Sequence, residues 1–581
     1  MNTIRLSENG VLPNTDITLS LHALMQQYPQ DTEFVFENAD YYFSPHKDLC
    51  ADYRISNSDV RPWRVLAIWL KDMKNCTLRG NGARLWLAGQ MQVFTLDHCE
   101  NVTLDGFTVN WEKPLVAEGT VVARNGLDVD VFIDPLAFPH RFVSDNLEFD
   151  TGNDEWYTFG KKAIAFEGHS LRARRNVADI FFDKIQPLGN SVYRMTLRKN
   201  EDIHVGDLLN LRHNARIHAG VFSEKCSNVT VENVTFHSCG GLGCLAQFCH
   251  DLTYRAVHFL PDTSRGRYVS SGRDDGMHIT CNSGTVTITE CTFHALMDDP
   301  INVHGCCVTS DEVVDERTLR CKYRHVQACG FHYWAEKGHE IAFIARDAMN
   351  SIGKAQVESY TLEDQMTFLL KFDRPLLQEI LDQAKKGNSL ALDNLTHTAA
   401  FVCTKNRFGS GRARSILVST PKPVRISDNY FESSGAAILV AGDSNYWFES
   451  GECHDVEIKG NVFTDACLGS EEYQFSHGTV SICPVVPSPD TQKPYHKNIR
   501  ITDNVFDTVG TPVLYAFSCG NLHFSGNRIY KSPSAPSVNS QKAQIQLSHC
   551  TNVSIEQNQW IGHFADVKLS KEACDAVRSD L

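Results

Sequence analysis

A short strand-like motif recurs along the chain and constrains its fold more than any other feature. It begins with a polar residue, often Asn or Asp, alternates aliphatic and polar residues, and closes on an aliphatic or aromatic residue. The copies are NCTLRGNGA (75–83), NVTLDGFTV (101–109), NVTVENVTF (228–236), DLTYRAVHF (251–259), TVTITECTF (285–293), PVRISDNYF (423–431), DVEIKGNVF (455–463), NIRITDNVF (498–506), NLHFSGNRI (521–529) and NVSIEQNQW (552–560). Several neighbouring copies start 23 to 34 residues apart, which is typical of a solenoid.

The local pattern indicates which solenoid forms. Alternation with period two, rich in Val, Ile and Thr, predicts strands, and Asn and Gly suit turns that need a positive φ. No amphipathic helix fits between the copies at 228 and 251, and the Leu framework of leucine-rich repeats is missing. The predicted fold is therefore all-β, a right-handed parallel β-helix in which inward side chains stack on like residues one coil away.

Cysteines support this repeat. Six of the twenty lie two positions before a copy of the motif, namely Cys99, Cys226, Cys249, Cys453, Cys519 and Cys550. Placement at one phase of the coil predicts an interior ladder of small apolar thiols. A metal site is the weaker interpretation, because no CxxC pair occurs and Cys239, Cys244 and Cys249 have a spacing unusual for zinc.

Two long segments, about 111–214 and 306–418, lack the coil pattern but contain β-rich runs, and we interpret them as inserted β-barrel-like modules. Helical spacing over 16–28, at Leu19, Leu21, Leu24 and Met25, predicts a helix that covers the N-terminal end. The expected organisation is an N-terminal cap with the first coils (1–110), the first inserted module (111–214), coils that carry an acidic site (215–305), the second inserted module (306–418), C-terminal coils (419–565) and a tail (566–581).

Charge and hydropathy narrow the partners. A net charge of −15 argues against nucleic acid or an anionic membrane and fits a neutral substrate better. The N-terminal residues show no signal-peptide core and no window has the length of a membrane span, so we expect a cytoplasmic protein, secreted only if a signal had been removed. A homodimer is left open.

The segments RDDGMH (273–278) and ALMDDPINVHG (295–305) carry paired acids. Asp275 and Asp298 are 23 residues apart, the coil length seen between 228 and 251, so Asp274, Asp275, Asp298 and Asp299 are expected in one patch. His278 and His304 follow the two pairs and should lie nearby. Clustered carboxyls raise one another's pKa, which can leave one protonated and another ionised, as a general acid and a general base require. Inverting glycosidases use such a pair.

Less specific interpretations apply to each pair alone. A single Asp-Asp is usually a solvated turn, and acid clusters can bind calcium. Two pairs in register, each followed by His, favour a catalytic site, and His fits a calcium shell poorly.

The order D-x-x-H, one coil, M-D-D-x-x-N-V-H-G resembles glycoside hydrolase family 110, exo-acting α-1,3-galactosidases that include enzymes cleaving the blood-group-B antigen. The resemblance extends over most of the chain, including NGARLWLAGQMQVFTLDHCENVTLDGFTVNW and RFGSGRARSILVSTPKPVRISDNYFESSGAAILVAGDSNYWFESG. It implies a β-helix with inserted β-barrels and metal-free inversion at the anomeric carbon of an α-galactoside oligosaccharide or glycan, without a cofactor.

By this resemblance Asp298 matches the general acid, and Asp275 and Asp299 match the acids that position and deprotonate water. Substrate-binding roles are expected for His278, Asn302, His304, Asp274, Arg412, Arg414, Trp447 and Glu449.

Two other functions, a polygalacturonase-like hydrolase and a non-catalytic carbohydrate-binding protein, are compatible with a β-helix. A polygalacturonase-like hydrolase would also cluster Asp on adjacent coils, but it cleaves an anionic polymer, and the net charge of −15 and the missing G-H-G and R-I-K stretches count against it. A non-catalytic β-helix that binds carbohydrate would have no need of clustered protonatable acids.

Overall fold

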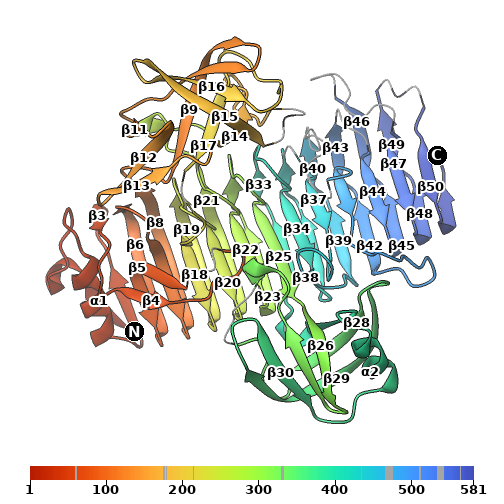
Figure 1. The fold of residues 1–581 in the computed structure, drawn as a ribbon. Helices are drawn as coiled ribbons and strands as arrows, with labels where there is room; N and C mark the ends of the chain where they lie inside the picture. Colours follow the sequence, from red (N-terminus) through yellow and green to blue (C-terminus); the bar gives the residue numbers. More distant parts are fainter. Residues whose placement is uncertain are drawn as a thin grey trace.

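The computed structural model describes residues 1–58, 62–174, 177, 179–213, 215–328, 333–432, 435–464, 476–508, 512–532, 542–562, 564 and 566–581. Two long and almost entirely parallel sheets run side by side along the molecule, and two β-barrels project from them (Figure 1). The predicted fold class, a parallel β-helix with two inserted β-barrels, is confirmed.

The first sheet contains β1 (Asn2–Arg5), β2 (Thr32–Val35), β3 (Asp40–Phe43), β6 (Lys74–Leu87), β8 (Glu100–Trp111), β19 (Ser227–Phe236), β21 (His250–Phe259), β23 (Ser283–Thr289), β24 (Thr292–Phe293), β32 (Ala400–Thr404), β33 (Arg407–Phe408), β35 (Val424–Ser427), β36 (Tyr430–Phe431), β39 (Val456–Lys459), β40 (Val462–Thr464), β42 (His496–Thr502), β43 (Val505–Thr508), β45 (Cys519–Ser525), β46 (Arg528–Lys531), β48 (Thr551–Glu556), β49 (Gln559–Ile561) and β51 (Asp575–Ser579).

The second sheet contains β4 (Cys50–Asp52), β5 (Trp63–Lys71), β7 (Gln92–Asp97), β18 (Val221–Glu224), β20 (Cys244–Gln247), β22 (Met277–Thr280), β25 (Ile301–Cys306), β34 (Ile416–Ser419), β37 (Ile438–Val440), β38 (Glu449–Ser450), β41 (Val480–Ile482), β44 (Leu514–Phe517), β47 (Ile545–Ser548) and β50 (Leu569–Glu572).

Like residues stack from coil to coil along the interior, as the repeat predicts. A column of phenylalanines shows this most clearly, with neighbouring ring centroids 4.6 to 5.8 Å apart along Phe236, Phe259, Phe293, Phe408, Phe431, Phe463 and Phe506. All of these rings are buried. Stacking therefore supplies the apolar core that a single short strand could not form.

A column of cysteines and a column of asparagines accompany the phenylalanine column. The Cys99 N–H donates to Cys226 Sγ at 3.3 Å, and all six cysteines of the predicted ladder are buried free thiols. A column of asparagines, absent from the predictions, lies at the turns in the order Asn406, Asn429, Asn461, Asn504, Asn527 and Asn558, and all but the last are buried. From Asn429 on, each Oδ1 accepts the backbone N–H of the asparagine one coil earlier at 2.9 to 3.0 Å. The column gives buried turn N–H groups the acceptor that they need.

The first barrel leaves the β-helix after β8 and returns before β18. It consists of β9 (Val116–Asn125), β10 (Asp128–Phe132), β14 (Lys162–Phe166), β15 (Ile180–Gly189), β16 (Val192–Leu197) and β17 (Leu208–Arg212). A three-stranded sheet is inserted within it, β11 (His140–Val143), β12 (Asn146–Gly152) and β13 (Glu155–Thr158).

The second barrel leaves after β25. It consists of β26 (Val308–Asp315), β27 (Thr318–Lys322), β28 (Glu340–Ala345), β29 (Asn350–Leu362), β30 (Thr367–Phe372) and β31 (Leu390–Asn394). Helix α2 (Gln378–Lys385) packs Ile380, Leu381 and Ala384 into its core.

Two predicted boundaries differ from the structure. Residues 400–408 were assigned to the second inserted module, but β32 and β33 pair in parallel with β23 and β24 and so form a β-helix coil. Residues 566–581 were expected to be a tail, but β50 and β51 pair with β47 and β48 as a final coil. AFVCTKNRF (400–408) does follow the motif, whereas the last coil is too polar to show it.

Helix α1 (Thr18–Gln27) lies at the N-terminal end of the β-helix, near β5 (Figure 1). Leu21, Leu24 and Met25 are buried, but Leu19, which was predicted to share that face, is exposed. Within the described ranges, no helix has the length and apolar character needed to cross a membrane.

Candidate active site

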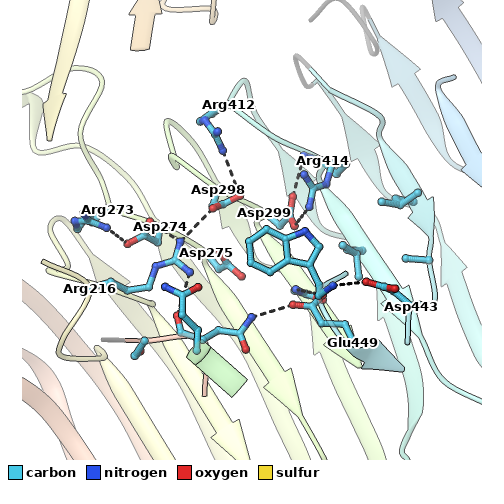
Figure 2. Close-up of a pocket in the computed structure, with 18 of the residues that line it drawn as sticks. Arg216, Arg273, Asp274, Asp275, Asp298, Asp299, Arg412, Arg414, Asp443 and Glu449 are labelled. Carbon is cyan, nitrogen blue, oxygen red and sulfur yellow. Dashed lines mark hydrogen bonds and ion pairs between the residues drawn. The ribbon is translucent and has the colours of Figure 1, made fainter. Parts of the chain in front are cut away.

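A cavity of about 780 Å³ opens where the second sheet of the β-helix meets both barrels. The first barrel contributes Lys162 and Arg212 to its wall, and the segment between β27 and β28 contributes Val326 and Gln327. All four predicted aspartates line the cavity, together with Asn302, Arg412, Arg414, Trp447 and Glu449 (Figure 2). The structure therefore brings nine of the eleven predicted site residues to one cavity.

The aspartates occupy the turns that lead into two neighbouring strands. Asp274 and Asp275 precede β22, and Asp298 and Asp299 precede β25. Met277 pairs with Ile301, an offset of 24 residues, one more than the spacing of 23 used for the prediction. The coil register consequently sets Asp275 level with Asp299 and Asp274 level with Asp298. Main-chain bonds fix this register, since the Gly276 N–H donates to Asp299 O at 3.0 Å.

Asp274 is held by cations. Arg216 Nη2 donates to its Oδ1 at 2.7 Å, and Arg273 Nη1 donates to its Oδ2 at 2.6 Å. Burial alone would raise the pKa of Asp274, but Arg216, Arg273 and Arg212 outweigh it and hold that pKa well below the usual range. Asp274 therefore stays ionised and anchors the arginines.

Asp298 also faces two arginines. Arg216 Nη2 lies 3.2 Å from its Oδ2, and Arg412 Nη1 lies 3.5 Å from its Oδ1. Burial raises the pKa of Asp298, but Arg412 and Arg216 more than offset this, so the net direction is downward. The charge around Asp298 thus favours its carboxylate form.

The other two carboxyls have the opposite tendency. Arg414 donates to Asp299 through its backbone N–H at 3.0 Å and through Nη2 at 2.8 Å. Burial is the main cause that raises the pKa of Asp299 and of Asp275 well above the usual range, and the negative charge of Asp298 adds to it. Protons shared among carboxyls that interact this strongly belong to the cluster, and the cluster can both give and take a proton.

His278 and His304 were predicted to bind substrate, but neither lines the cavity; both are buried behind it. His278 Nδ1 lies 2.8 Å from Asp275 Oδ2, and the two Nε2 atoms lie 3.0 Å apart. His278 pairs with Asn302 one coil away, and His304 lies two residues after Asn302, so the three side chains share one face of the sheet. The cavity wall beside Asn302 is formed instead by Glu449, which contacts both Asn302 and His304.

Glu449 joins this group from the opposite wall. Asn57 Nδ2 donates to its Oε1 at 2.9 Å, Asn302 Nδ2 donates to its Oε2 at 3.3 Å, and His304 Nε2 lies 3.7 Å from Oε1. Burial raises its pKa, but His304, His278 and the amide hydrogen bonds outweigh it and lower it overall. One ring nitrogen from each of His278 and His304 and one carboxylate oxygen from Glu449 all lie within 4.8 Å of one another.

Trp447 reaches the cavity from a loop that Asp443 organises. The Asp443 carboxylate accepts the backbone N–H groups of residues 445 to 448, including that of Tyr446 at 2.8 Å and that of Phe448 at 3.3 Å. His325, from the second barrel, packs against the indole with ring centroids 4.7 Å apart. Asp443 therefore fixes the backbone that carries Trp447, and His325 packs against its ring.

Several lining residues were not predicted, among them Asn57, Lys162, Arg216, Arg273 and Asp443. Arg273 directly precedes the first acid pair, which is a local signal that charge compensation could have indicated. Lys162 and Asn57 come from segments far away in the chain, and nothing in the repeat marks them. Both approach only because the first barrel and the N-terminal coils fold onto the site.

Comparisons with known proteins identify the family. No family model matches the chain. The α-1,3-galactosidase B of Bacteroides thetaiotaomicron is 34% identical over 568 residues, covering 94% of this chain and 90% of that protein. The α-1,3-galactosidase B of Akkermansia muciniphila is 30% identical and covers 93% and 67%. The exopolygalacturonase of Yersinia enterocolitica, a solved structure, has a TM-score of 0.42 at 9% identity, covering 100% of this chain and 78% of that one. The similarity to the two α-1,3-galactosidases, over most of both chains, shows that this chain belongs to the α-1,3-galactosidase family.

Proposed function

We propose that the protein is an exo-acting glycoside hydrolase that removes terminal α-1,3-linked galactose from oligosaccharides or glycans, with inversion at the anomeric carbon. One observation carries the proposal: turns on adjacent coils place four aspartates in one cavity, and their pKa values are driven apart. Family membership supports the substrate class. At a finer level we propose glycoside hydrolase family 110 and activity on the blood-group-B trisaccharide.

The cavity suits a neutral sugar. Its volume of about 780 Å³ lies within the range of about 300–1,000 Å³ common for small-ligand sites. Among the residues that the structure describes, six cations line it, and each has a carboxylate partner within 4.0 Å: Lys162, Arg212, Arg216, Arg273, Arg412 and Arg414. A polyuronate would need cations that are not already paired, so this pairing favours galactose over galacturonate.

Two buried polar atoms of the cavity wall lack a hydrogen-bond partner among the residues that the structure describes. One is the acceptor Asn302 Oδ1 and the other is the donor Arg414 Nε. A buried polar group without a partner is costly, and a sugar hydroxyl can both donate and accept. We propose that galactose hydroxyls satisfy them, with Trp447 as the flat face of the subsite.

For the chemistry we propose that Asp298 donates a proton to the glycosidic oxygen and that Asp275 and Asp299 position and deprotonate water. The base gains one proton and the acid loses one, so the enzyme's proton count is unchanged after each turnover. The arginines that favour ionised Asp298 support a second assignment, in which Asp298 is the base and Asp275 or Asp299 the acid.

The test compares purified wild-type protein with Asp298→Asn, Asp275→Asn and Asp299→Asn on Galα1-3Gal, Galα1-4Gal, Galα1-6Glc and the fucosylated blood-group-B trisaccharide. We expect galactose release only from the α-1,3 substrates, and losses of at least about 100-fold in each folded variant. The variant that lacks the general acid should keep activity on aryl galactosides, because a good leaving group needs no proton. Azide should restore activity to the variant that lacks the general base, because azide attacks without being deprotonated. Near-normal turnover by Asp298→Asn would refute the site.

A further inference from the structure

A buried chain of hydrogen bonds runs from Asp275 away from the cavity. Asp275 Oδ2 contacts His278 Nδ1 at 2.8 Å, His278 Nε2 contacts His304 Nε2 at 3.0 Å, and His304 Nδ1 contacts Gly305 O at 2.7 Å. Asp275, His278 and His304 are each at most 6% exposed. At these distances each contact is a hydrogen bond, so one proton must lie between the two atoms of each pair.

The donor and acceptor roles follow from the last bond. A carbonyl oxygen only accepts, so His304 Nδ1 must carry the proton that it donates to Gly305 O. The Nε2 of a neutral His304 is then an acceptor, and the 3.0 Å contact requires a proton on His278 Nε2. What remains is a single proton between His278 Nδ1 and Asp275 Oδ2.

We infer that His278 is a positioning residue that shares one proton with Asp275 and that His304 fixes the direction of the shared bond. This inference rests on the proposed function of Asp275 as an acid that activates water. With the proton on Oδ2, Asp275 is neutral and so is His278. With the proton on Nδ1, Asp275 is a carboxylate that can take a proton from water, and His278 is an imidazolium whose Nε2–H bond is unchanged.

The surrounding charges support a shared proton. Burial raises the pKa of Asp275 and lowers that of His278 to about 4, so the two affinities for the proton approach each other. Glu449 opposes the lowering of His278 and supplies a counter-charge for the imidazolium. The other charged groups that act on the pair are Arg216, Asp274, Asp298 and Asp299.

The direct test reads the protons themselves. In protein labelled with ¹⁵N-histidine, we expect the Nε2–H form for His278 and the Nδ1–H form for His304, assigned by comparison with His278→Gln and His304→Gln. The inference would be overturned if both rings carried a proton on Nδ1 and neither carried one on Nε2. A stoichiometric metal ion in the purified protein would also overturn it, because a metal bound to these nitrogens would replace the proton between them. The wild-type assay on Galα1-3Gal is independent of this reading, so failure of the proposed function is seen separately.

A kinetic test separates positioning from mere packing. Without an imidazole to accept its proton, Asp275 should hold that proton more tightly, so in His278→Gln we expect the acidic limb of the kcat/KM profile to move up by at least about one pH unit. kcat should fall at least about tenfold, while KM changes less than about threefold. The matched control is His397→Gln, a buried histidine that directly follows the last strand of the second barrel and does not line the cavity, which should keep the wild-type profile. An unshifted limb in His278→Gln would contradict the inference.

Discussion

Replacing Arg412 by Gln should raise the pKa of Asp298 without removing any carboxyl. Of the cations around Asp298, Arg412 has the largest effect on its pKa, and the two side chains approach to 3.5 Å. A bare pair at that distance is worth about 5 kcal/mol at an effective dielectric constant of about 20. That would be a shift of about 3.5 pKa units at 1.36 kcal/mol per unit.

The observed shift should be smaller. Arg216 remains 3.2 Å from Asp298, and the side chains of Arg412 and Asp298 are 19% and 23% exposed. We therefore expect about one to two units. Asp179, which pairs with Arg412 in the wild type, keeps Lys162 at 2.6 Å, so the variant retains one partner for that buried acid.

The assay is the pH profile of kcat for galactose release, because the position of a limb reports ionisation even where the rate falls. If Asp298 is the proton donor, its pKa sets the alkaline limb, which should move up by one to two units in Arg412→Gln. Arg412→Lys should restore most of the wild-type position, and Arg407→Gln, a charge change on the outer side of β33, should change neither limb. A shift of the acidic limb instead would refute the donor role and assign Asp298 as the base.

Three further predictions concern the β-helix. Phe431→Ala removes a buried ring stacked between Phe408 and Phe463 and should lower the free energy of unfolding by about 3–5 kcal/mol in denaturant titrations; a loss below about 1 kcal/mol would show that the column does not support the core. Asn461→Ala leaves the backbone N–H of Asn429 without its acceptor and should cost about 1–3 kcal/mol, measured in the same way, against almost nothing for the exposed Asn125→Ala. Burial, and then the nearby His454, lower the pKa of His496 to about 3, so below pH 6.5 the unfolded chain binds a proton that the folded chain does not bind. As the pH falls from 6.5 toward 3, this group should lower the free energy of unfolding by about 1.4 kcal/mol per pH unit. His496→Cys should flatten that slope, and an unchanged slope would show that another group causes it.

The β-helix could be predicted because each coil repeats the same short-range pattern. Positive φ at the leading Asn of several copies, such as Asn101 and Asn228, follows from local chemistry, and so does the burial of the alternating aliphatic residues. The asparagine column was not predicted, although five of its members, from Asn429 to Asn558, hold the same position in the last five copies of the motif. Its members look like ordinary turn residues, and only stacking shows that they satisfy buried N–H groups.

The site was predictable to the extent that coil spacing brings residues together. The two acid pairs share a cavity because their turns lie on adjacent coils, although the register is 24 residues rather than 23. Sequence spacing places His278 and His304 on the same face as Asn302, but it could not show that Glu449, from a distant segment, forms the cavity wall beside them. Nor could it show the charges that reach Asp298 from distant segments, such as Arg216.

The most direct measurement of the central claim follows the anomer that is released first. Proton NMR during hydrolysis of Galα1-3Gal by the wild-type protein resolves α- and β-galactose before they equilibrate. Two carboxyls acting on opposite faces of the sugar, one as acid and one as base, predict β-galactose as the first product. α-Galactose as the first product would contradict the account, because it would require one of these aspartates to form a covalent bond with the sugar.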